Sequence, residues 1–408
     1  NHIELLCHRI FNVIIIGGGA TGAGVARDCS LRGIRALLLE RGDIATGATG
    51  RNHGLLHSGA RYAVTDRESA EECIKENMIL RRIASHCVEQ TDGLFLSLPE
   101  DGLEFQAKFV EACRAAGIRA DVIDPKEALR LEPSANPAMV GAVRVPDGAV
   151  DPFRLTAANV IDAKAHGAEV LTYHEVLDFL REQNRITGVK VLDRKTGQTA
   201  EYRAQVVVNA GGIWGHDIAR KAGVTVNMLP AKGSLLIFGH RVNNIVLNRC
   251  RKPADADILV PGDTISLIGT TSSKVPFDEV DDMYVTADEV DLLLREGMKL
   301  APSLEHTRIL RAYAGFIHQR FQQRRVCQKI LPQAVLMLKL ARLAAIGCTL
   351  AILLLHVLPS SARQARTTAA GFSARSSAVP ITSASAPAAT ACAAVSALMP
   401  PSTMICPR

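Results

Sequence analysis

Three glycines, Gly17, Gly19 and Gly22, have the G-x-G-x-x-G spacing, and Glu40 follows 18 residues after the last of them. Glycines so spaced let the backbone turn tightly, approach a pyrophosphate and pack a helix close to a strand. A helix that begins there points free N–H groups and a positive dipole end at the phosphates. An acidic residue at this distance accepts the ribose hydroxyls of an adenosine. The chemistry predicted is dinucleotide binding.

The residues around the glycines predict the β-α-β unit that this chemistry needs. Residues 13–16 are a run of β-branched residues typical of a buried parallel strand, and residues 34–39 are a second apolar strand. The residues between them suit a helix. Because strand, glycine turn, helix, strand and acidic residue occur in this order, we predict a dinucleotide site and not a glycine turn without a ligand.

Residues 41–63 (RGDIATGATGRNHGLLHSGARYA) predict a long loop that leads into a helix. A loop of this length is unusual in a compact domain unless it contacts something. We expect Thr49, Asn52 and Leu55 to line the pyrophosphate and one side of a flavin ring. A second glycine-rich turn, residues 210–215, follows the apolar strand 201–209, as occurs where a flavin domain is interrupted and re-entered. Both features favour FAD over a nicotinamide cofactor.

The remaining pattern predicts alternating helices and strands. Helices are expected at 66–89, 105–117, 124–130, 153–167 and 286–301, and strands at 94–99, 139–145, 169–173, 185–193, 230–238, within 257–271 and at 309–315.

The basic net charge belongs to the C-terminal part of the sequence. Of the 47 Lys and Arg residues, ten lie in residues 316–408, so residues 1–315 carry 37 against all 41 acids, a net charge of −4. Basic residues interleaved with aromatic ones, as nucleic-acid binding needs, do not occur. The sequence therefore predicts no nucleic-acid partner.

Residues 316–408 contain no Asp or Glu. Three interpretations are open. The apolar residues 343–358 suggest a membrane anchor, but they are fewer than the ~18–20 residues of a spanning helix. The Ser-, Ala-, Thr- and Pro-rich remainder suggests an irregular or disordered tail. The abrupt change in mid-strand favours the third, a segment that is not the natural continuation of the fold, such as a shifted reading frame.

The ten cysteines show no CxxC and no spacing typical of zinc. We expect reduced thiols and no metal. The sequence has no initiator Met, and its first ten residues lack the order of a signal peptide, so we expect an incomplete or irregular start.

The sequence over residues 12–315 resembles the catalytic A subunits of anaerobic, FAD-dependent glycerol-3-phosphate dehydrogenases, a family of D-amino-acid-oxidase-like flavoproteins. The matches are long: DIATGATGRNHGLLHSGARYAVTD, VPDGAVDPFRLTAAN, VVVNAGGIWG, PAKGSLLI, NRCRKPADADILVPGDTISLIGTT and RILRAYAG. The resemblance implies an α/β fold, in which a Rossmann-like FAD-binding domain is interleaved with an α+β substrate domain that has an antiparallel sheet.

The resemblance also implies an activity: FAD-dependent oxidation of sn-glycerol 3-phosphate to dihydroxyacetone phosphate, with electrons passed to a quinone through partner subunits. The implied location is cytoplasmic, peripheral on the inner face of the cell membrane. We expect the FAD-binding domain at 12–90 and 146–215, the substrate domain at 91–145 and 216–315, and an aberrant low-complexity tail at 316–408.

Site residues are implied one by one. The positions that match the family's cofactor contacts are Gly17, Gly19, Gly22, Glu40, Arg41, Thr49, Asn52, Gly54, Leu55, Val176, Ala210, Gly211 and Trp214. The positions that match its substrate side are His57, Arg61, Tyr62 and Thr270. Thr270 and Thr271 end a strand that the family places near the flavin, and Lys232 is a weaker candidate for the same side of the site. We treat His53 and His174 as structural.

Alternatives are open at each catalytic position. Oxidation of an alcohol needs a base, and histidine titrates near neutrality, so His57 is the candidate base, or else a capping or flavin-supporting residue. The guanidinium of Arg61 suits a phosphate, or else a surface ion pair. Tyr62 binds substrate through a hydrogen bond or serves packing.

The sequence departs from the family after residue 315. The family continues with V-R-P-L, whose arginine grips the substrate phosphate, whereas residues 316–319 read FIHQ. The family's later G-G-K-x-x-T-Y-R stretch, which closes over the flavin, and its cysteine-rich region do not occur. One lost charge-assisted contact costs ~1.5–3 kcal/mol. We therefore expect a truncated or defective member without native-like activity.

Two other functions compete with this one. Another oxidase of the same superfamily would act on a 2-hydroxy acid or an amine, and the RNHGLLHSGARY run argues against it. An inactive dinucleotide-binding remnant would keep only the site for the ADP moiety. The flavin spectrum of the purified protein separates the remnant from both enzymes.

Overall fold

The computed structural model describes residues 10–183, 185–226, 228–318 and 353–354. The strands form a seven-stranded sheet, a nine-stranded sheet and a small three-stranded sheet. All three lie in the first of two compact units, residues 1–359. The predictions for residues 319–352 and 355–408, which include most of the aberrant tail and of the apolar stretch 343–358, lie outside the described residues.

The seven-stranded sheet has the order β10-β11-β12-β1-β2-β9, and β19 pairs with β12. Strands β12, β1, β2 and β9 run parallel to one another. The pairs β10–β11 and β11–β12 are antiparallel. The bounds are β1 Ile10–Ile16, β2 Ala36–Glu40, β9 Glu169–Thr172, β10 His174–Glu182, β11 Arg185–Asp193, β12 Thr199–Asn209 and β19 Leu353–Leu354.

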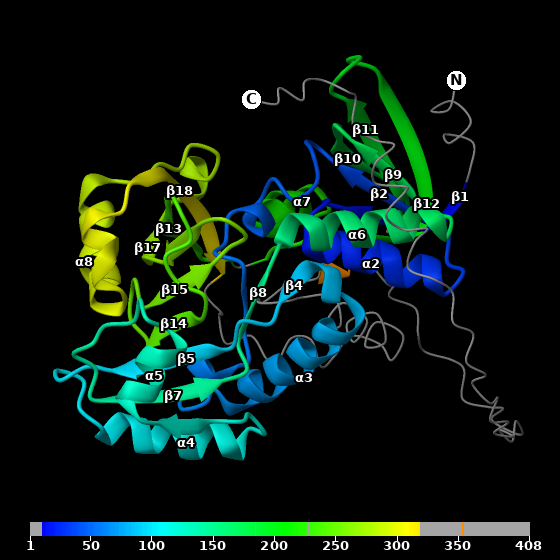
Figure 1. The fold of residues 1–408 in the computed structure, drawn as a ribbon. Coiled ribbons are helices and arrows are strands. Elements are labelled where there is room, and N and C mark those ends of the chain that lie inside the picture. The colour runs from blue at the N-terminus through cyan, green and yellow to red at the C-terminus, as the bar shows by residue number, and fades with distance from the viewer. Residues whose placement is uncertain (1–9, 184, 227, 319–352, 355–408) are drawn as a thin grey trace, which may run out of the picture. The chain divides into compact units, whose positions relative to one another are not determined.

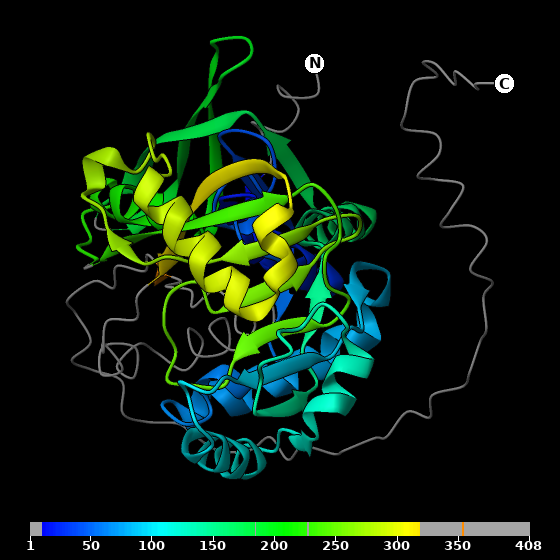
Figure 2. The ribbon, with the colours of Figure 1, turned by 60° about the vertical axis from the view of Figure 1, so that its left-hand side comes forward.

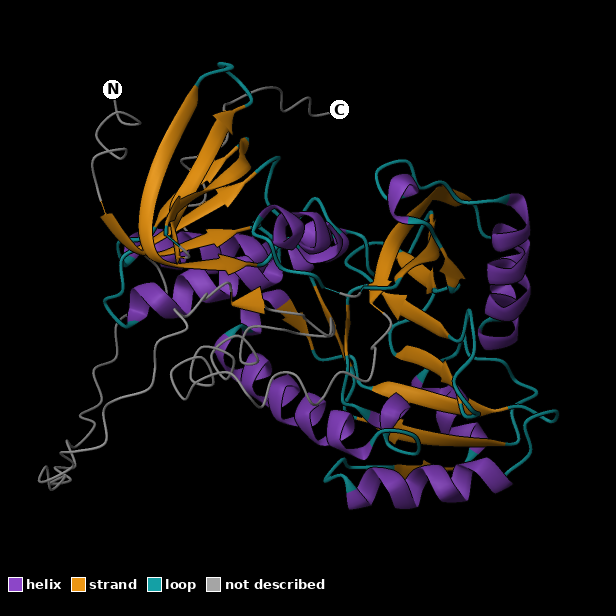
Figure 3. Cartoon of the chain, turned by 180° about the vertical axis from the view of Figure 1, so that it is seen from behind, coloured by secondary structure: helices purple, strands orange, loops and turns teal. Residues whose placement is uncertain are grey.

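Both faces of the parallel strands are buried, which explains their unbroken apolar runs. Alternate residues such as Val13 and Ile15 pack against helices α2 (Ala20–Leu31) and α6 (Pro152–Ala165). The two helices lie side by side in Figure 1, and Figure 3 shows this helical layer from behind. Ile14 packs on the opposite face against residues of the β10–β11 hairpin.

The nine-stranded sheet has the order β17-β13-β16-β15-β14-β5-β7-β6, and β18 pairs with β13. Its pairs are antiparallel except β14 with β5. The bounds are β5 Gly93–Ser97, β6 Asp121–Ile123, β7 Gly141–Val145, β13 Pro230–Phe238, β14 Val246–Arg249, β15 Ile258–Pro261, β16 Ser266–Gly269, β17 Ser273–Lys274 and β18 Ile309–His318.

Helices cover the nine-stranded sheet on both faces. Helix α8 (Ala287–Leu300) packs through Leu293 and Leu300 against Leu236 and Leu247, and Figure 2 shows this yellow helix in front of the strands. The other face packs against α4 (Glu104–Ala115) and the start of α3 (Arg67–Ile83). The three-stranded sheet joins β3 (Leu55–Leu56), β8 (Gly148–Val150) and β4 (Val88–Glu89).

Side-chain caps begin four of the helices, as their sequences suggest. Asp124 and Asp151 accept hydrogen bonds from the first N–H groups of α5 (Pro125–Leu131) and α6, each with proline in the first turn. Asp66 caps α3 in the same way. Thr286 and Glu289 form a capping box at α8.

The structure corrects some expected boundaries. The helix expected at 66–89 ends at Ile83, because residues 85–87 form a 3₁₀ turn and Val88–Glu89 joins a sheet as β4. Strands β8, β10 and β14 were not expected. Strand β18 continues past Gly315 to His318, so residues 316–318 belong to the nine-stranded sheet and not to the tail. Residues 353–354, also assigned to the tail, pair with β12.

The predicted interleaving agrees with how the strands are shared. Residues 10–40 and 169–209 supply six strands of the seven-stranded sheet, and residues 353–354 supply the seventh, while residues 93–145 and 230–318 supply the nine-stranded sheet. The domain boundaries themselves stay a prediction. No helix in the described part of the chain is long and apolar enough to cross a membrane.

Candidate functional site

The first glycine turn lies against the second one. Gly17 has φ +111°, and a Cβ there would lie 2.4 Å from the carbonyl oxygen of Ala210. The Ala210 N–H donates to the Ile16 carbonyl (2.8 Å), so the ends of β1 and β12 are joined. A Cβ on Gly22 would lie 1.8 Å from the Gly17 carbonyl oxygen. Only glycine therefore fits at these two positions.

Thr49 stands at the N-terminus of α2. Its Oγ1 accepts a hydrogen bond from the Ala20 N–H (3.0 Å), and a Cβ on Gly19 would lie 3.0 Å from the same oxygen. The expected phosphate-binding turn, the helix N-terminus and Thr49 are thus together. The cavity of ≈ 140 Å³ near Ile10 and Glu169 lies at the other end of β1, so it is not the predicted dinucleotide site.

Glu40 stands at the end of β2, beside the same turn. One carboxylate oxygen accepts from the Gly18 N–H (2.6 Å) and the other from the Gly42 N–H (2.8 Å). Each carboxylate oxygen has two lone pairs, so both keep one for a ribose hydroxyl. Val176, the expected adenine contact, lies on β10 with its side chain buried in the core beneath this sheet face.

Arg41 and Trp214 come together from distant parts of the sequence. The Arg41 guanidinium lies 4.1 Å from the centroid of the Trp214 ring, and both side chains bind the Asp281 carboxylate, at 3.2 and 2.9 Å. The stack joins the β2 end to the second glycine turn. In that turn the Gly211 N–H donates to the Asn209 side chain (3.1 Å).

The loop after Thr49 is held by its own side chains. Asn52 donates to the Thr49 carbonyl (2.6 Å) and accepts from the Gly54 N–H (2.7 Å). Gly54 has φ +69°, and its carbonyl accepts from Val150. Leu55 then pairs with Ala149 as β3. The Asn52 carbonyl also accepts from the Tyr313 hydroxyl (3.0 Å), which links this loop to β18.

The segment that carries His57 is anchored from below by two buried groups. Asn77 on α3 donates to the carbonyls of Leu56 and His57, both at 3.1 Å. Asp147 accepts from the N–H and the hydroxyl of Ser58, both at 2.7 Å. Burial raises the pKa of Asp147, while the Ser58 hydrogen bonds oppose the shift. These contacts fix the backbone on both sides of the candidate base.

His57 does not titrate near neutrality, in contrast to the expectation from its type. Burial, with smaller contributions from His53 and Arg61, lowers its pKa to about 3. Burial likewise lowers the pKa of His53 to about 4, and the Nδ1 of His53 accepts from the Leu55 N–H (3.2 Å). Both rings are therefore neutral at pH 7. Neutral imidazole is the form that accepts a proton, so the base role stays a prediction.

Arg61 and Tyr62 lie next to His57 in space. The Tyr62 and His57 ring centroids are 5.5 Å apart. The Arg61 guanidinium reaches across to the segment between β14 and β15, where it donates to the Ala254 carbonyl (2.9 Å) and lies 3.7 Å from the Asp257 carboxylate. Its side chain is 15% exposed. The run that holds His57, Arg61 and Tyr62 thus contacts the segment between β14 and β15, a contact that the sequence alone did not predict.

Thr270 and Thr271, at the end of β16, and Lys232 on β13 contact different elements. The Thr270 carbonyl accepts from the Ala256 N–H (3.0 Å), so it lies beside the segment that Arg61 contacts. Thr271 is buried, accepts from the Ser234 N–H and donates to Glu289 of α8. Lys232 also binds Glu289 (2.9 Å). Thr271 and Lys232 therefore both point to the α8 side of the sheet.

In the part of the chain that the structure describes, no group of three or more His, Cys, Asp or Glu side chains is placed to hold a metal ion. Five cysteines in that part are free thiols. Burial raises the pKa of Cys113 and of Cys250 to about 12, so these thiols stay protonated at neutral pH.

Comparison with known proteins decides the family. The sequence profile of the family described as "FAD dependent oxidoreductase" matches residues 12–331. The chain belongs to this family. The FAD dependent oxidoreductases use FAD, so the cofactor expected from the sequence is confirmed at the level of the family.

Relatives of known name are close in sequence. The chain is 67% identical over 304 residues to the A subunit of the anaerobic glycerol-3-phosphate dehydrogenase of Escherichia coli K12, an alignment that covers 74% of this chain and 56% of that protein. It is 65% identical to the protein of the same name from Haemophilus influenzae, covering 74% and 54%. The chain therefore spans about half the length of the curated relatives it matches.

Solved structures confirm the fold of this oxidoreductase. An L-proline dehydrogenase from P. horikoshii has a TM-score of 0.67 at 24% identity, covering 78% of this chain and 83% of its own. A glycerol-3-phosphate dehydrogenase from Bacillus halodurans, complexed with FAD, has a TM-score of 0.58 at 23% identity, covering 77% and 58%. At these identities the likeness concerns the fold, which agrees with the predicted α/β class.

The residues of this oxidoreductase fit the ADP part of FAD. The glycine turn leaves no room for side chains at Gly17 and Gly22, α2 begins directly after Gly19, and Glu40 lies beside the turn. A glycine turn, a helix N-terminus and an acidic residue at the ends of parallel strands are the features that a dinucleotide needs.

Sequence reasoning missed the residues that hold the site in place. Asn77 lies in the helix expected at 66–89, and a polar residue on the apolar stripe of that helix was the available signal. Asp147 follows the strand expected at 139–145 and was not among the site residues. Arg251 and Asp257 pair with each other within one segment, but the residues that tie them to the site, Glu296 and Arg61, lie on other elements and left no local signal.

Proposed function

We propose that this FAD dependent oxidoreductase oxidises sn-glycerol 3-phosphate at C2 to dihydroxyacetone phosphate. The observation that carries the proposal is the 67% identity over 304 residues to a protein named as the A subunit of an anaerobic glycerol-3-phosphate dehydrogenase. The grouping of His57, Arg61 and Tyr62 supports it, because a base, a phosphate-binding guanidinium and a hydroxyl are what this substrate needs.

Each side chain has a proposed role. Arg61 binds the substrate phosphate through its guanidinium, and this contact places C2 and its hydroxyl. His57, neutral at pH 7, accepts the hydroxyl proton. Tyr62 donates a hydrogen bond to a substrate oxygen, and Thr270 lies on the same side of the substrate site. FAD, when bound, would supply the acceptor for the hydride that leaves C2. The hydride and the hydroxyl proton together remove two electrons and two protons from the alcohol, and a ketone remains.

We propose two groups of cofactor residues, one around the ADP part of FAD and one nearer the flavin ring. Gly17, Gly19, Gly22 and Thr49 surround the pyrophosphate, Glu40 binds the ribose, and Val176 meets the adenine. The second group lies nearer the ring: Arg41, Asn52, Gly54, Leu55, Ala210, Gly211 and Trp214. The meeting of Gly17 with Ala210 and of Arg41 with Trp214 supports one continuous site.

The proposed partners follow from the relatives' name, and the proposed location follows from the resemblance of the sequence to their family. A protein named as one lettered subunit of a dehydrogenase works together with other subunits. We therefore propose that electrons pass from the flavin to a quinone through partner subunits, and that the chain works in the cytoplasm, peripheral on the inner face of the cell membrane.

The test is made with the purified full chain. We expect a flavin absorbance spectrum and bleaching of that spectrum by sn-glycerol 3-phosphate without oxygen. Dihydroxyacetone phosphate should form more slowly than native-like activity would give, because residues 316–319 (FIHQ) lack the arginine expected to grip the substrate phosphate. Glycerol, a 2-hydroxy acid and glycine serve as alternative substrates, and we expect no bleaching with them. Flavin that is bleached by glycine or the 2-hydroxy acid, but not by glycerol 3-phosphate, would overturn the proposed substrate. Protein without flavin would overturn the proposal as a whole.

A further inference from the structure

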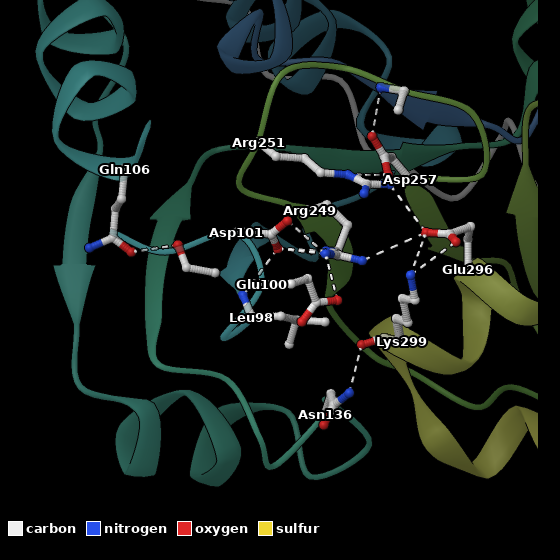
Figure 4. Close-up of polar contacts among 12 residues, drawn as sticks. Leu98, Glu100, Asp101, Gln106, Asn136, Arg249, Arg251, Asp257, Glu296 and Lys299 are labelled. Carbon is white, nitrogen blue, oxygen red and sulfur yellow. Dashed lines mark hydrogen bonds and ion pairs between the residues drawn. The ribbon is translucent and has the colours of Figure 1, made fainter. Parts of the chain in front are cut away.

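A series of ion pairs, most of their side chains buried, ends at Arg61. The series begins on the loop after β5, continues through the end of β14 and the side of α8, and reaches Asp257 just before β15. Figure 4 shows the interactions from Asp101 through Arg249, Glu296 and Arg251 to Asp257. Neither the proposed catalytic steps nor the cofactor site uses these residues.

Asp257 connects this series of ion pairs to Arg61. Its side chain is fully buried. One carboxylate oxygen accepts two hydrogen bonds from Arg251, from Nη2 (2.6 Å) and Nε (3.2 Å). The other accepts from the Ala254 N–H (2.8 Å) and lies 3.7 Å from Nη1 of Arg61. Because Arg61 also donates to the Ala254 carbonyl, Asp257 orders both the segment and the guanidinium.

Arg251 is itself held from α8. Its Nη2 lies 3.2 Å from the Glu296 carboxylate, which also accepts from Lys299 (3.1 Å). Arg249 is 1% exposed, and it donates to both oxygens of Asp101 (2.7 and 2.6 Å) and to Glu100 (3.1 Å). A buried frame of this kind keeps its geometry, because breaking one pair leaves an uncompensated charge in a low-dielectric interior.

The three arginines differ in how far they are neutralised. Arg249 and Arg251 each have carboxylates within hydrogen-bond distance on two different residues. Among the described residues, Arg61 has one carboxylate at ion-pair distance, Asp257 at 3.7 Å, which it shares with Arg251. The field at Arg61 is therefore the least compensated of the three. A phosphate dianion that reaches this cluster binds most strongly at Arg61.

We propose that Asp257 is a positioning residue that aims the Arg61 guanidinium at the substrate phosphate, and that Arg251 fixes Asp257 for this task. The inference rests on the proposed function, because it takes glycerol 3-phosphate as the ligand of Arg61. Asp257 does not touch the substrate. It acts through Arg61, and the frame on α8 and β14 sets the place where the phosphate binds.

The experiment measures binding of glycerol 3-phosphate by calorimetry, in a double-mutant cycle, to the full chain loaded with FAD. The FAD is chemically reduced beforehand, so that the substrate binds without being oxidised. Asp257→Asn keeps the shape and removes the charge, and Arg61→Ala removes the proposed phosphate ligand. We expect each single variant to weaken binding on the order of tenfold, and the double variant to be no weaker than Arg61→Ala. Effects that add in the double variant would overturn the inference.

Two further variants complete the test. Asp92→Asn breaks a partly buried ion pair with Arg144 (Nε to Oδ2, 2.9 Å) away from Arg61, and we expect unchanged substrate binding. If Asp257→Asn yields no FAD-loaded protein, Arg251→Lys takes its place, because it keeps the charge but loses the two-pronged contact. Unchanged binding by Arg251→Lys would then overturn the inference. Failure of the unaltered chain to bind glycerol 3-phosphate would instead overturn the proposed function.

Discussion

The carbonyl oxygen of Ala210 lies 2.4 Å from the point where a Cβ on Gly17 would stand. The two glycine turns of the chain therefore share one contact, in which the end of β12 closes over the end of β1. Any side chain at Gly17 would push these strand ends apart.

We predict that Gly17→Ala abolishes FAD binding. The substitution places a methyl group against backbone atoms and at φ +111°, where an L side chain is strained. Flavin content of the purified protein measures the effect. Gly33→Ala is the matched control, because Gly33 also has a positive φ (+72°) but nothing within 4 Å of the added Cβ. It should keep its FAD and lose about 1 kcal/mol of stability.

Glu40→Gln should weaken FAD binding on the order of tenfold, because an amide replaces one of the two carboxylate oxygens that accept from Gly18 and Gly42. Equilibrium dialysis against FAD gives the dissociation constant. Glu182→Gln, at an exposed ion pair with Arg203, should bind FAD as the unaltered chain does. Equal FAD affinity of the Glu40 and Glu182 variants would show that Glu40 has no part in the cofactor site.

Asn77→Ala should slow reduction of the flavin by substrate and lower the free energy of unfolding. The buried amide donates to the carbonyls of Leu56, His57 and Pro146, and each buried carbonyl left without a partner costs about 1–3 kcal/mol. Urea unfolding and stopped-flow reduction measure the two effects. Asn159→Ala loses one hydrogen bond, to Leu155 on its own helix, so its rate of flavin reduction should not change.

Stability should fall as the pH falls below about 6.5, the ordinary pKa of histidine. The unfolded chain then binds protons at His53 and His57, whereas the folded chain does not until about pH 4 and 3. Protons bound by the unfolded state alone favour unfolding, so this stability is present above pH 6.5 and is lost toward pH 4.

Replacement of both histidines by glutamine should flatten this acid dependence, measured as the urea midpoint at pH 7.5 and 5. The control is His306→Gln, since the His306 side chain is 85% exposed. An acid dependence unchanged in the double variant would contradict the lowered pKa values of His53 and His57.

Local sequence signals predicted many elements of this protein. The apolar runs of β1, β2 and β12 indicated buried strands, and helices were expected at 124–130, 153–167 and 286–301, close to α5, α6 and α8, because buried strands and amphipathic helices are visible as patterns of neighbouring residues. Short strands such as β8 and β14 escaped prediction, since three or four residues show no period and form only against a partner strand.

The site divides in the same way. The sequence by itself determined the dinucleotide turn, since the Gly17–Gly22 spacing and Glu40 lie in one β-α-β unit. It also placed His57, Arg61 and Tyr62 in one short run. The tertiary structure alone decided that Ala210 closes on Gly17, that Arg41 stacks on Trp214, and that Asp257 holds Arg61. It also lowered the pKa of His57, because burial and charge depend on which distant elements fold around a residue.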